Sequence, residues 1–136
     1  MTRLLQTFAL SLLVACSADQ PVLTATDVQI PAPIPGASMG AAYLSLHNNS
    51  DQAISITNVA SPQMKSVEMH ESVLEDGISR MFKLSQVTIA PQQSVVFERG
   101  SKHLMLRYPT DTPTQVTLQF FADDTLLLSV EADLKE

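Results

Sequence analysis

The chain has 136 residues, a length that supports one domain with its own hydrophobic core. Its formal net charge is −6, and the scattered acidic residues leave no basic surface that could bind nucleic acid. No apolar stretch reaches the ~18 residues that a membrane-spanning helix needs.

The first residues have the pattern of a bacterial lipoprotein signal. Arg3 precedes an apolar stretch over 4–15, and the stretch ends in the sequence LVAC, whose last residue is Cys16. This ending resembles the lipobox, in which the signal is cut before a cysteine that is then acylated. Cys16 is the only cysteine of the chain, so a lipid thioether explains it economically. The alternative is a plain signal peptide with an incidental cysteine in its apolar region.

The chain is therefore predicted to have three parts. A signal peptide covers 1–15, a lipid-anchored tether covers 16–21 and a folded domain covers 22–136. More than one acyl chain holds a protein durably on a bilayer, so we expect the mature protein on a bacterial membrane, facing the periplasm. Ser17 follows the cysteine where an aspartate would signal retention, and this favours the outer membrane.

After the tether, the sequence predicts an all-β domain. Nine segments are enriched in β-branched and aromatic residues and show partial alternation, and clusters of Pro, Gly, Asn and Asp separate them. The segments are 22–30, 41–48, 53–60, 65–73, 78–84, 94–98, 103–108, 114–121 and 125–134. We expect about nine short antiparallel strands in a sandwich or Greek-key barrel.

The fourth and fifth segments are predicted to form a hairpin that carries two candidate metal ligands. A four-residue loop over 74–77 would set His70 directly opposite Met81. The same register would bring the opposite charges of Glu71 and Arg80 face to face, which favours it. A two-residue Asp-Gly turn would shift the pairing by two and leave His70 and Met81 as diagonal neighbours on the same face.

A later strand supplies two further candidates. His103 and Met105 are two residues apart, so in a strand both side chains leave by the same face. Two imidazoles with two thioethers form a soft set of ligands that favours Cu(I) over magnesium or calcium. A blue-copper centre would need a cysteine thiolate, and the only cysteine belongs to the lipobox.

The other methionines and the third histidine are interpreted as structural. A methionine in a strand is usually core filler, and we predict this for Met39, Met64 and Met69. His47 stands at a strand end before an Asn-rich turn and is predicted to be a solvated turn residue. The acidic residues near the hairpin are interpreted as a solvated face.

The four candidate ligands also carry a resemblance. His70, ten residues, Met81, twenty-one residues, His103, one residue and Met105 reproduce the pattern H(M)-x10-M-x21-H-x-M. The chain thus resembles the periplasmic copper chaperone family often called PCuAC. The resemblance implies a cupredoxin-like β-barrel that binds Cu(I) through these four positions and delivers copper for the assembly of cytochrome c oxidase.

The sequence therefore predicts a copper carrier rather than an enzyme. There is no nucleophile with a base, no convergent carboxylate pair and no phosphate-binding loop. The expected partner is a copper-accepting protein of the cell envelope, and contact with the membrane is expected through the lipid anchor alone. Two alternatives remain open at this stage: a copper-sequestering or resistance lipoprotein, and a structural or interaction lipoprotein with an unused site.

Overall fold

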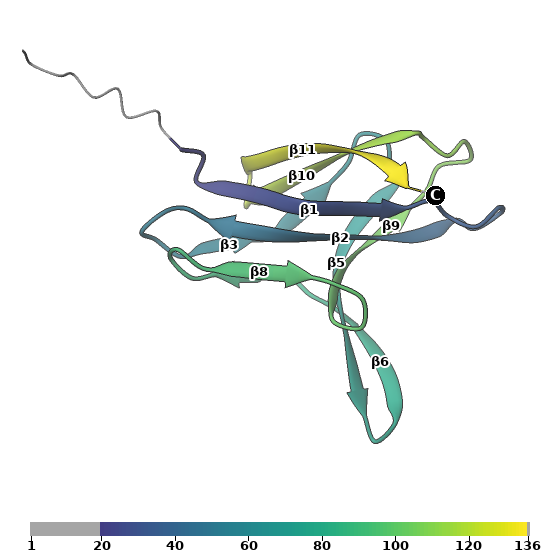
Figure 1. The fold of residues 1–136 in the computed structure, drawn as a ribbon, viewed down its shortest axis with the longest axis horizontal. Coiled ribbons are helices and arrows are strands. Elements are labelled where there is room, and N and C mark those ends of the chain that lie inside the picture. Colours follow the sequence, from purple (N-terminus) through teal and green to yellow (C-terminus); the bar gives the residue numbers. More distant parts are fainter. Residues whose placement is uncertain (1–19, 136) are drawn as a thin grey trace, which may run out of the picture.

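The computed structural model describes residues 20–135, and this part of the chain folds into strands without a helix (Figure 1). The strands are β1 (Leu23–Pro31), β2 (Met39–Asn48), β3 (Ile54–Ile56), β4 (Asn58–Ala60), β5 (Ser66–Glu75), β6 (Ile78–Lys83), β7 (Val87–Ile89), β8 (Ser94–Phe97), β9 (Lys102–Arg107), β10 (Gln115–Ala122) and β11 (Thr125–Lys135). No helix that could cross a membrane occurs among these residues.

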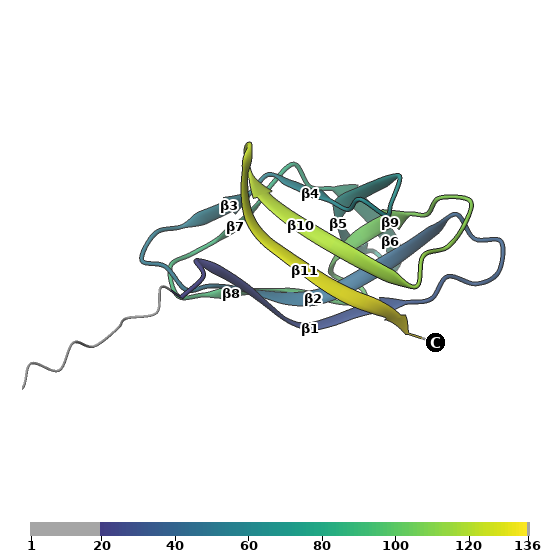
Figure 2. The same ribbon diagram turned by 90° about the horizontal axis from the view of Figure 1, so that it is seen from above.

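Most of the strands belong to one strongly curved sheet. Its order is β4-β10-β11-β1-β2-β9-β5-β6, with β8 also paired to β2, while β3 and β7 form a separate two-stranded sheet. Figure 2 shows β1, β2 and β8 in one layer and β3, β4, β5 and β7 in a second, with β10 and β11 crossing obliquely from one layer to the other. The curvature brings β4 at one end of the order into contact with β5 near the other end. The predicted all-β sandwich or barrel is confirmed.

Three details of the predicted strands are wrong. The segment 53–60 is two strands, because the Thr57 amide donates to the carbonyl of Phe121 at 2.9 Å and turns the chain from β7 towards β10. The short strand β7 was not predicted, and the described chain thus has eleven strands instead of nine. The sheet is also not wholly antiparallel, since β1 and β11 run parallel, with Ile30 opposite Leu134.

The core lies between the layers and fixes which face each strand turns outward. Leu104 and Leu106 of β9 are fully buried, as are Leu44 and Leu46 of β2. Side chains alternate along a strand, so the intervening residues of β9 face away from this core. Most of the buried hydrophobic side chains are Leu, Ile and Val.

A close contact positions the start of β2. A Cβ atom at Gly40 would lie 2.6 Å from Cε2 of Tyr108, whose ring is almost completely buried. Only a residue without a side chain permits this approach. Residue 40 therefore faces the buried ring, and Met39 and Ala41 on either side of it face outward.

The β5–β6 hairpin projects from the body of the molecule (Figure 1). Asp76 and Gly77 have φ values of 51° and 76°, the signature of a two-residue type I′ turn. Glu75 consequently pairs with Ile78, and every pair further along is shifted by two from the predicted register. The predicted pairing of His70 with Met81 is wrong.

The charge argument behind that register failed because each charge has another partner. Glu71 forms its ion pair with Lys102 of β9, at 2.7 Å. Arg80 lies 3.6 Å from Glu75, further along the hairpin. Turn geometry, which requires positive φ at two consecutive residues, thus decided the register over a surface ion pair.

Candidate metal centre

Two histidines lie directly opposite each other on neighbouring strands. His70 of β5 pairs with His103 of β9, and their ring centroids are 6.0 Å apart. The alternation of β9 sends both rings to the outer face of the sheet, away from Leu104. Both strands are held on both sides, because β5 lies between β9 and β6, and β9 lies between β2 and β5.

A carboxylate and a lysine hold the ring of His70. Its Nε2 donates a hydrogen bond of 2.9 Å to Oε2 of Glu68, and the other oxygen of Glu68 accepts one of 2.6 Å from Nζ of Lys83. The bond from Lys83, followed by that from His70, lowers the pKa of Glu68 to about 2. Glu68 is therefore a carboxylate throughout the physiological pH range and accepts from both neighbours.

These contacts leave one nitrogen of each imidazole free to bind a metal. In the neutral ring, with Nε2 donating to Glu68, the lone pair is on Nδ1 of His70, and this buried atom has no hydrogen-bond partner among the described residues. Nδ1 of His103 donates to the carbonyl of Ser101 at 3.0 Å, which leaves the lone pair on Nε2. Hydrogen bonds of this kind orient metal-binding histidines and fix their tautomers. The donor set fits a metal ion.

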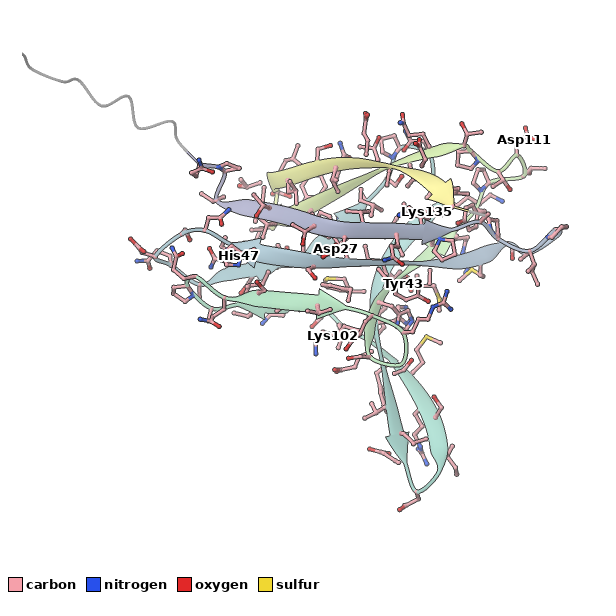
Figure 3. All side chains as sticks on the ribbon, viewed as in Figure 1. Asp27, Tyr43, His47, Lys102, Asp111 and Lys135 are labelled. Atoms are coloured by element: carbon pink, nitrogen blue, oxygen red, sulfur yellow. The ribbon has the colours of Figure 1, made fainter. Side chains whose placement is uncertain are left out.

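Met105 lies on the same face beside the histidines. It is two residues beyond His103 in β9 and opposite Glu68 in β5. A surface pocket of about 500 Å³ is lined by His103, Met105 and Tyr43, among others. Figure 3 shows Tyr43 on the side of β2 from which the hairpin projects.

Met81 shares this face but stands further out. It pairs with Ser72, while Lys83 pairs with His70, so Met81 and His70 are diagonal neighbours. Its side chain is 51% exposed. Diagonal neighbours remain within reach of long side chains, so Met81 stays a candidate ligand for the same ion as His70. The structure thus brings three predicted ligands onto the barrel and places the fourth on the hairpin.

Of the three methionines interpreted as core, one is not. Met64 and Met69 are 8% and 4% exposed and belong to the core. Met39 is 37% exposed and lines the same pocket as His103 and Met105. The core interpretation of Met39 is wrong because β2 begins two residues earlier than predicted and presents residue 39 outward.

Sequence patterns did not reveal the roles of Glu68, which contacts His70 within β5, and of Lys83, which reaches Glu68 only in the observed hairpin register. The signal in the sequence was a carboxylate two residues before a histidine in a predicted strand, where both side chains share a face.

His47 lies in β2, away from Tyr43 and the hairpin (Figure 3), and its Nδ1 is 2.8 Å from Oγ of Ser94. Within residues 20–135, no group of three or more His, Cys, Asp or Glu side chains is placed to hold a metal. Cys16 lies outside the described residues.

Comparison with known protein families identifies the family of the chain. The family model described as "Putative lipoprotein LpqE-like" matches residues 23–132. The chain belongs to the LpqE-like family. The match covers nearly all of the described domain, from β1 into β11. Among curated proteins, this LpqE-like chain is 28% identical over 91 residues to the uncharacterized protein RP573 of Rickettsia prowazekii, a match that covers 64% of the chain. The chain spans about half the length of that relative, since the match covers 50% of it.

Solved structures share the fold of this LpqE-like protein. The copper-bound PCuAC domain from PmoF2 has a TM-score of 0.66 at 15% identity, with 84% of this chain and 92% of that domain covered. The apo PCuAC domain from PmoF1 has the same TM-score and identity, with 84% and 93% covered. Apo-DR1885 from Deinococcus radiodurans has a TM-score of 0.58 at 24% identity, with 100% and 97% covered. The cupredoxin-like fold implied by the resemblance to PCuAC proteins is confirmed.

Proposed function

We propose that this protein is an extracytoplasmic copper chaperone that binds Cu(I) through His70, Met81, His103 and Met105. The observation that carries the proposal is the pair of opposed imidazoles. Hydrogen bonds to Glu68 and to the backbone leave one lone pair on each ring for the metal. The two methionines add thioethers on the same face.

The chemistry of these ligands favours the reduced ion. Thioether sulfur is soft and carries no proton to lose, so it binds Cu(I) without competition from protons. Imidazole is a good ligand for copper when neutral. A relative of the same fold is described as copper-bound, which supports copper as the metal.

A carrier must also release its metal, and the arrangement suits release. Met81 is half-exposed on a projecting hairpin, so an incoming ligand can replace its thioether without rearranging the barrel. We propose that a copper-accepting protein of the cell envelope takes the ion by such ligand exchange. Assembly of cytochrome c oxidase, which the resemblance to PCuAC proteins implies, is the proposed destination.

An acylated Cys16 would place this exchange at a membrane of the cell envelope. The family description as a lipoprotein supports this location. The proposed anchor holds the protein on a bacterial membrane, facing the periplasm. We propose the outer membrane, because Ser17 stands after the cysteine where an aspartate would signal retention.

Anaerobic titration with Cu(I) in competition with a chromogenic chelator tests binding. We expect one Cu(I) per chain in wild type and weaker binding when His70 or His103 is replaced by Ala. Incubation of the loaded protein with a purified apo acceptor then separates delivery from sequestration. If wild-type protein takes no Cu(I) from the chelator, the proposed function is refuted. If it binds Cu(I) but does not transfer the ion to the acceptor, it is a sequestering protein.

A further inference from the structure

Met39 lines a pocket together with two of the candidate copper ligands, His103 and Met105. It is the first residue of β2 and pairs with Arg107, while Ala41 two residues later pairs with Met105. Met39 and Met105 are therefore diagonal neighbours on adjacent strands, a separation that long side chains bridge. Both line the pocket that His103 also lines.

The backbone fixes this placement. Gly40 faces the buried ring of Tyr108 so closely that any side chain there would clash, which commits Met39 to the opposite, outer face. The core gains little from Met39, which is 37% exposed, whereas Met64 and Met69 are buried in it. Packing therefore does not account for a methionine at this position.

The chemistry of the neighbourhood does account for it. A thioether is a soft, neutral ligand that suits Cu(I). Two of its neighbours in the pocket, His103 and Met105, are proposed ligands, and Nε2 of His103 has its lone pair free. His70 and Met81 do not line this pocket, so the pocket opens onto one side of the four-residue site.

We propose that Met39 is a further copper-binding residue, which with His103 and Met105 forms an open position for Cu(I) next to the four-residue site. This inference rests on the proposed function and extends it to the path of the ion. An arriving Cu(I) binds first to Met39, Met105 and His103. It then exchanges the sulfur of Met39 for Nδ1 of His70 and the sulfur of Met81, and leaves by the reverse exchange. One metal–sulfur bond breaks as two metal–ligand bonds form, copper stays Cu(I), and no proton is released.

Methyl NMR of the methionines tests the contact directly. Wild-type protein with ¹³C-labelled methionine methyl groups is mixed anaerobically with one equivalent of Cu(I) bicinchoninate. We expect the methyl signals of Met81 and Met105 to shift, and that of Met39 to move and broaden because its sulfur exchanges on and off the ion. The signals of Met64 and Met69, which lie in the core, stay in place.

The kinetics of Met39→Leu test the function of the contact. Leucine keeps an apolar side chain of similar size but cannot bind copper. We expect removal of Cu(I) by excess chelator to slow by about tenfold, the order of loss usual when a group supporting a metal site is removed. Equilibrium affinity changes less than this rate does, because the four-residue site is intact. Met69→Leu, a matched change in the core, keeps the wild-type rate.

The outcomes separate this inference from the proposed function. If wild type binds Cu(I) but the Met39 methyl signal does not move and Met39→Leu exchanges copper at the wild-type rate, the inference is wrong and the proposed function stands. A Met39 signal that moves without any change in rate would also overturn the proposed path. If wild type binds no Cu(I), both proposals fall together.

Discussion

His70 lies directly opposite His103 across the β5–β9 ladder, with their ring centroids 6.0 Å apart. Each ring donates one N–H to a fixed oxygen, so the two lone pairs are on different atoms: Nδ1 of His70 and Nε2 of His103. This asymmetry gives Glu68 a specific role in the proposed copper site, since within residues 20–135 it is the hydrogen-bond partner that sets the tautomer of His70.

Replacing Glu68 tests that role. Glu68→Ala removes the acceptor for Nε2 of His70, and we expect Cu(I) affinity to fall by about tenfold, typical for the loss of a group that orients a metal-binding histidine. Glu68→Gln keeps an acceptor oxygen and should lose less. Competition titration measures both variants. Glu71→Ala is the matched control, since Glu71 is also a carboxylate of β5 paired with a lysine, at 2.7 Å, but is bound to no histidine. Equal losses for the two alanine variants would contradict the role of Glu68.

The thioethers are tested by leucine substitutions. Met81→Leu and Met105→Leu should each weaken Cu(I) binding and change the free energy of unfolding by less than ~1.5 kcal/mol, because the side-chain volume is nearly conserved. Chelator competition measures the affinity, and urea unfolding measures the stability. Met64→Leu and Met69→Leu change buried methionines on the core face and should leave the affinity at its wild-type value. Unweakened binding by both Met81→Leu and Met105→Leu would exclude a four-ligand site.

Stability is expected to depend on the Glu68 carboxylate at low pH. Folding lowers the pKa of Glu68 from 4.5 to about 2, first through Lys83 and then through His70. The unfolded chain therefore binds the proton more readily, so the stabilisation is complete above pH 4.5 and is lost as the pH falls towards 2. Urea unfolding of wild type and Glu68→Gln over this range should show the difference between them shrinking as the pH falls. A difference that is constant with pH would contradict the assignment.

The contact between Gly40 and Tyr108 predicts a costly substitution. In Gly40→Ala, the new Cβ would lie 2.6 Å from Cε2 of Tyr108, and the buried ring has little room to move. We expect a loss of ~1–3 kcal/mol in the free energy of unfolding, the usual cost of overpacking. Urea unfolding measures it. Tyr108→Leu combined with Gly40→Ala should lose less than the two single losses added, whereas strict additivity would show that the two residues do not compete for space.

The lipid anchor is tested on membrane-extracted protein. Mass spectrometry should find a mature chain that begins at acylated Cys16, as expected for the LVAC sequence at 13–16. Cys16→Ala should release the chain from the membrane or block its processing. Soluble, unmodified protein that begins after Cys16 would contradict the prediction.

The sequence predicted the face of the strand on which a side chain lies far better than it predicted which residue or strand lies beside it. Alternation along a strand follows from backbone geometry, so His103 and Met105 were correctly placed on one face before any neighbour was known. The predicted hairpin register was wrong because the register depends on the turn. The prediction relied on an ion pair between Glu71 and Arg80, whereas the two-residue Asp-Gly turn sets the register. The pairing of β5 with β9 joins segments far apart in the chain, and local sequence patterns do not encode which distant strand becomes a neighbour.

The same limit explains what was missed at the site. Met39 becomes a neighbour of Met105 only because β2 pairs with β9. Lys83 reaches Glu68 only in the register that the type I′ turn imposes. The four candidate ligands are visible in the sequence as a spaced pattern, but the residues that surround them depend on the order of strands in the sheet.

The parallel pairing of β1 with β11 has a consequence for how this chain reaches its native state. The first strand of the described domain finds one of its two neighbours in the last, with Ile30 beside Leu134. Until β11 arrives, one edge of β1 remains open to unwanted strand pairing, and contacts this distant in sequence also slow folding. A chain that is threaded through a membrane from its N-terminus would therefore complete its sheet only after nearly all of it has crossed.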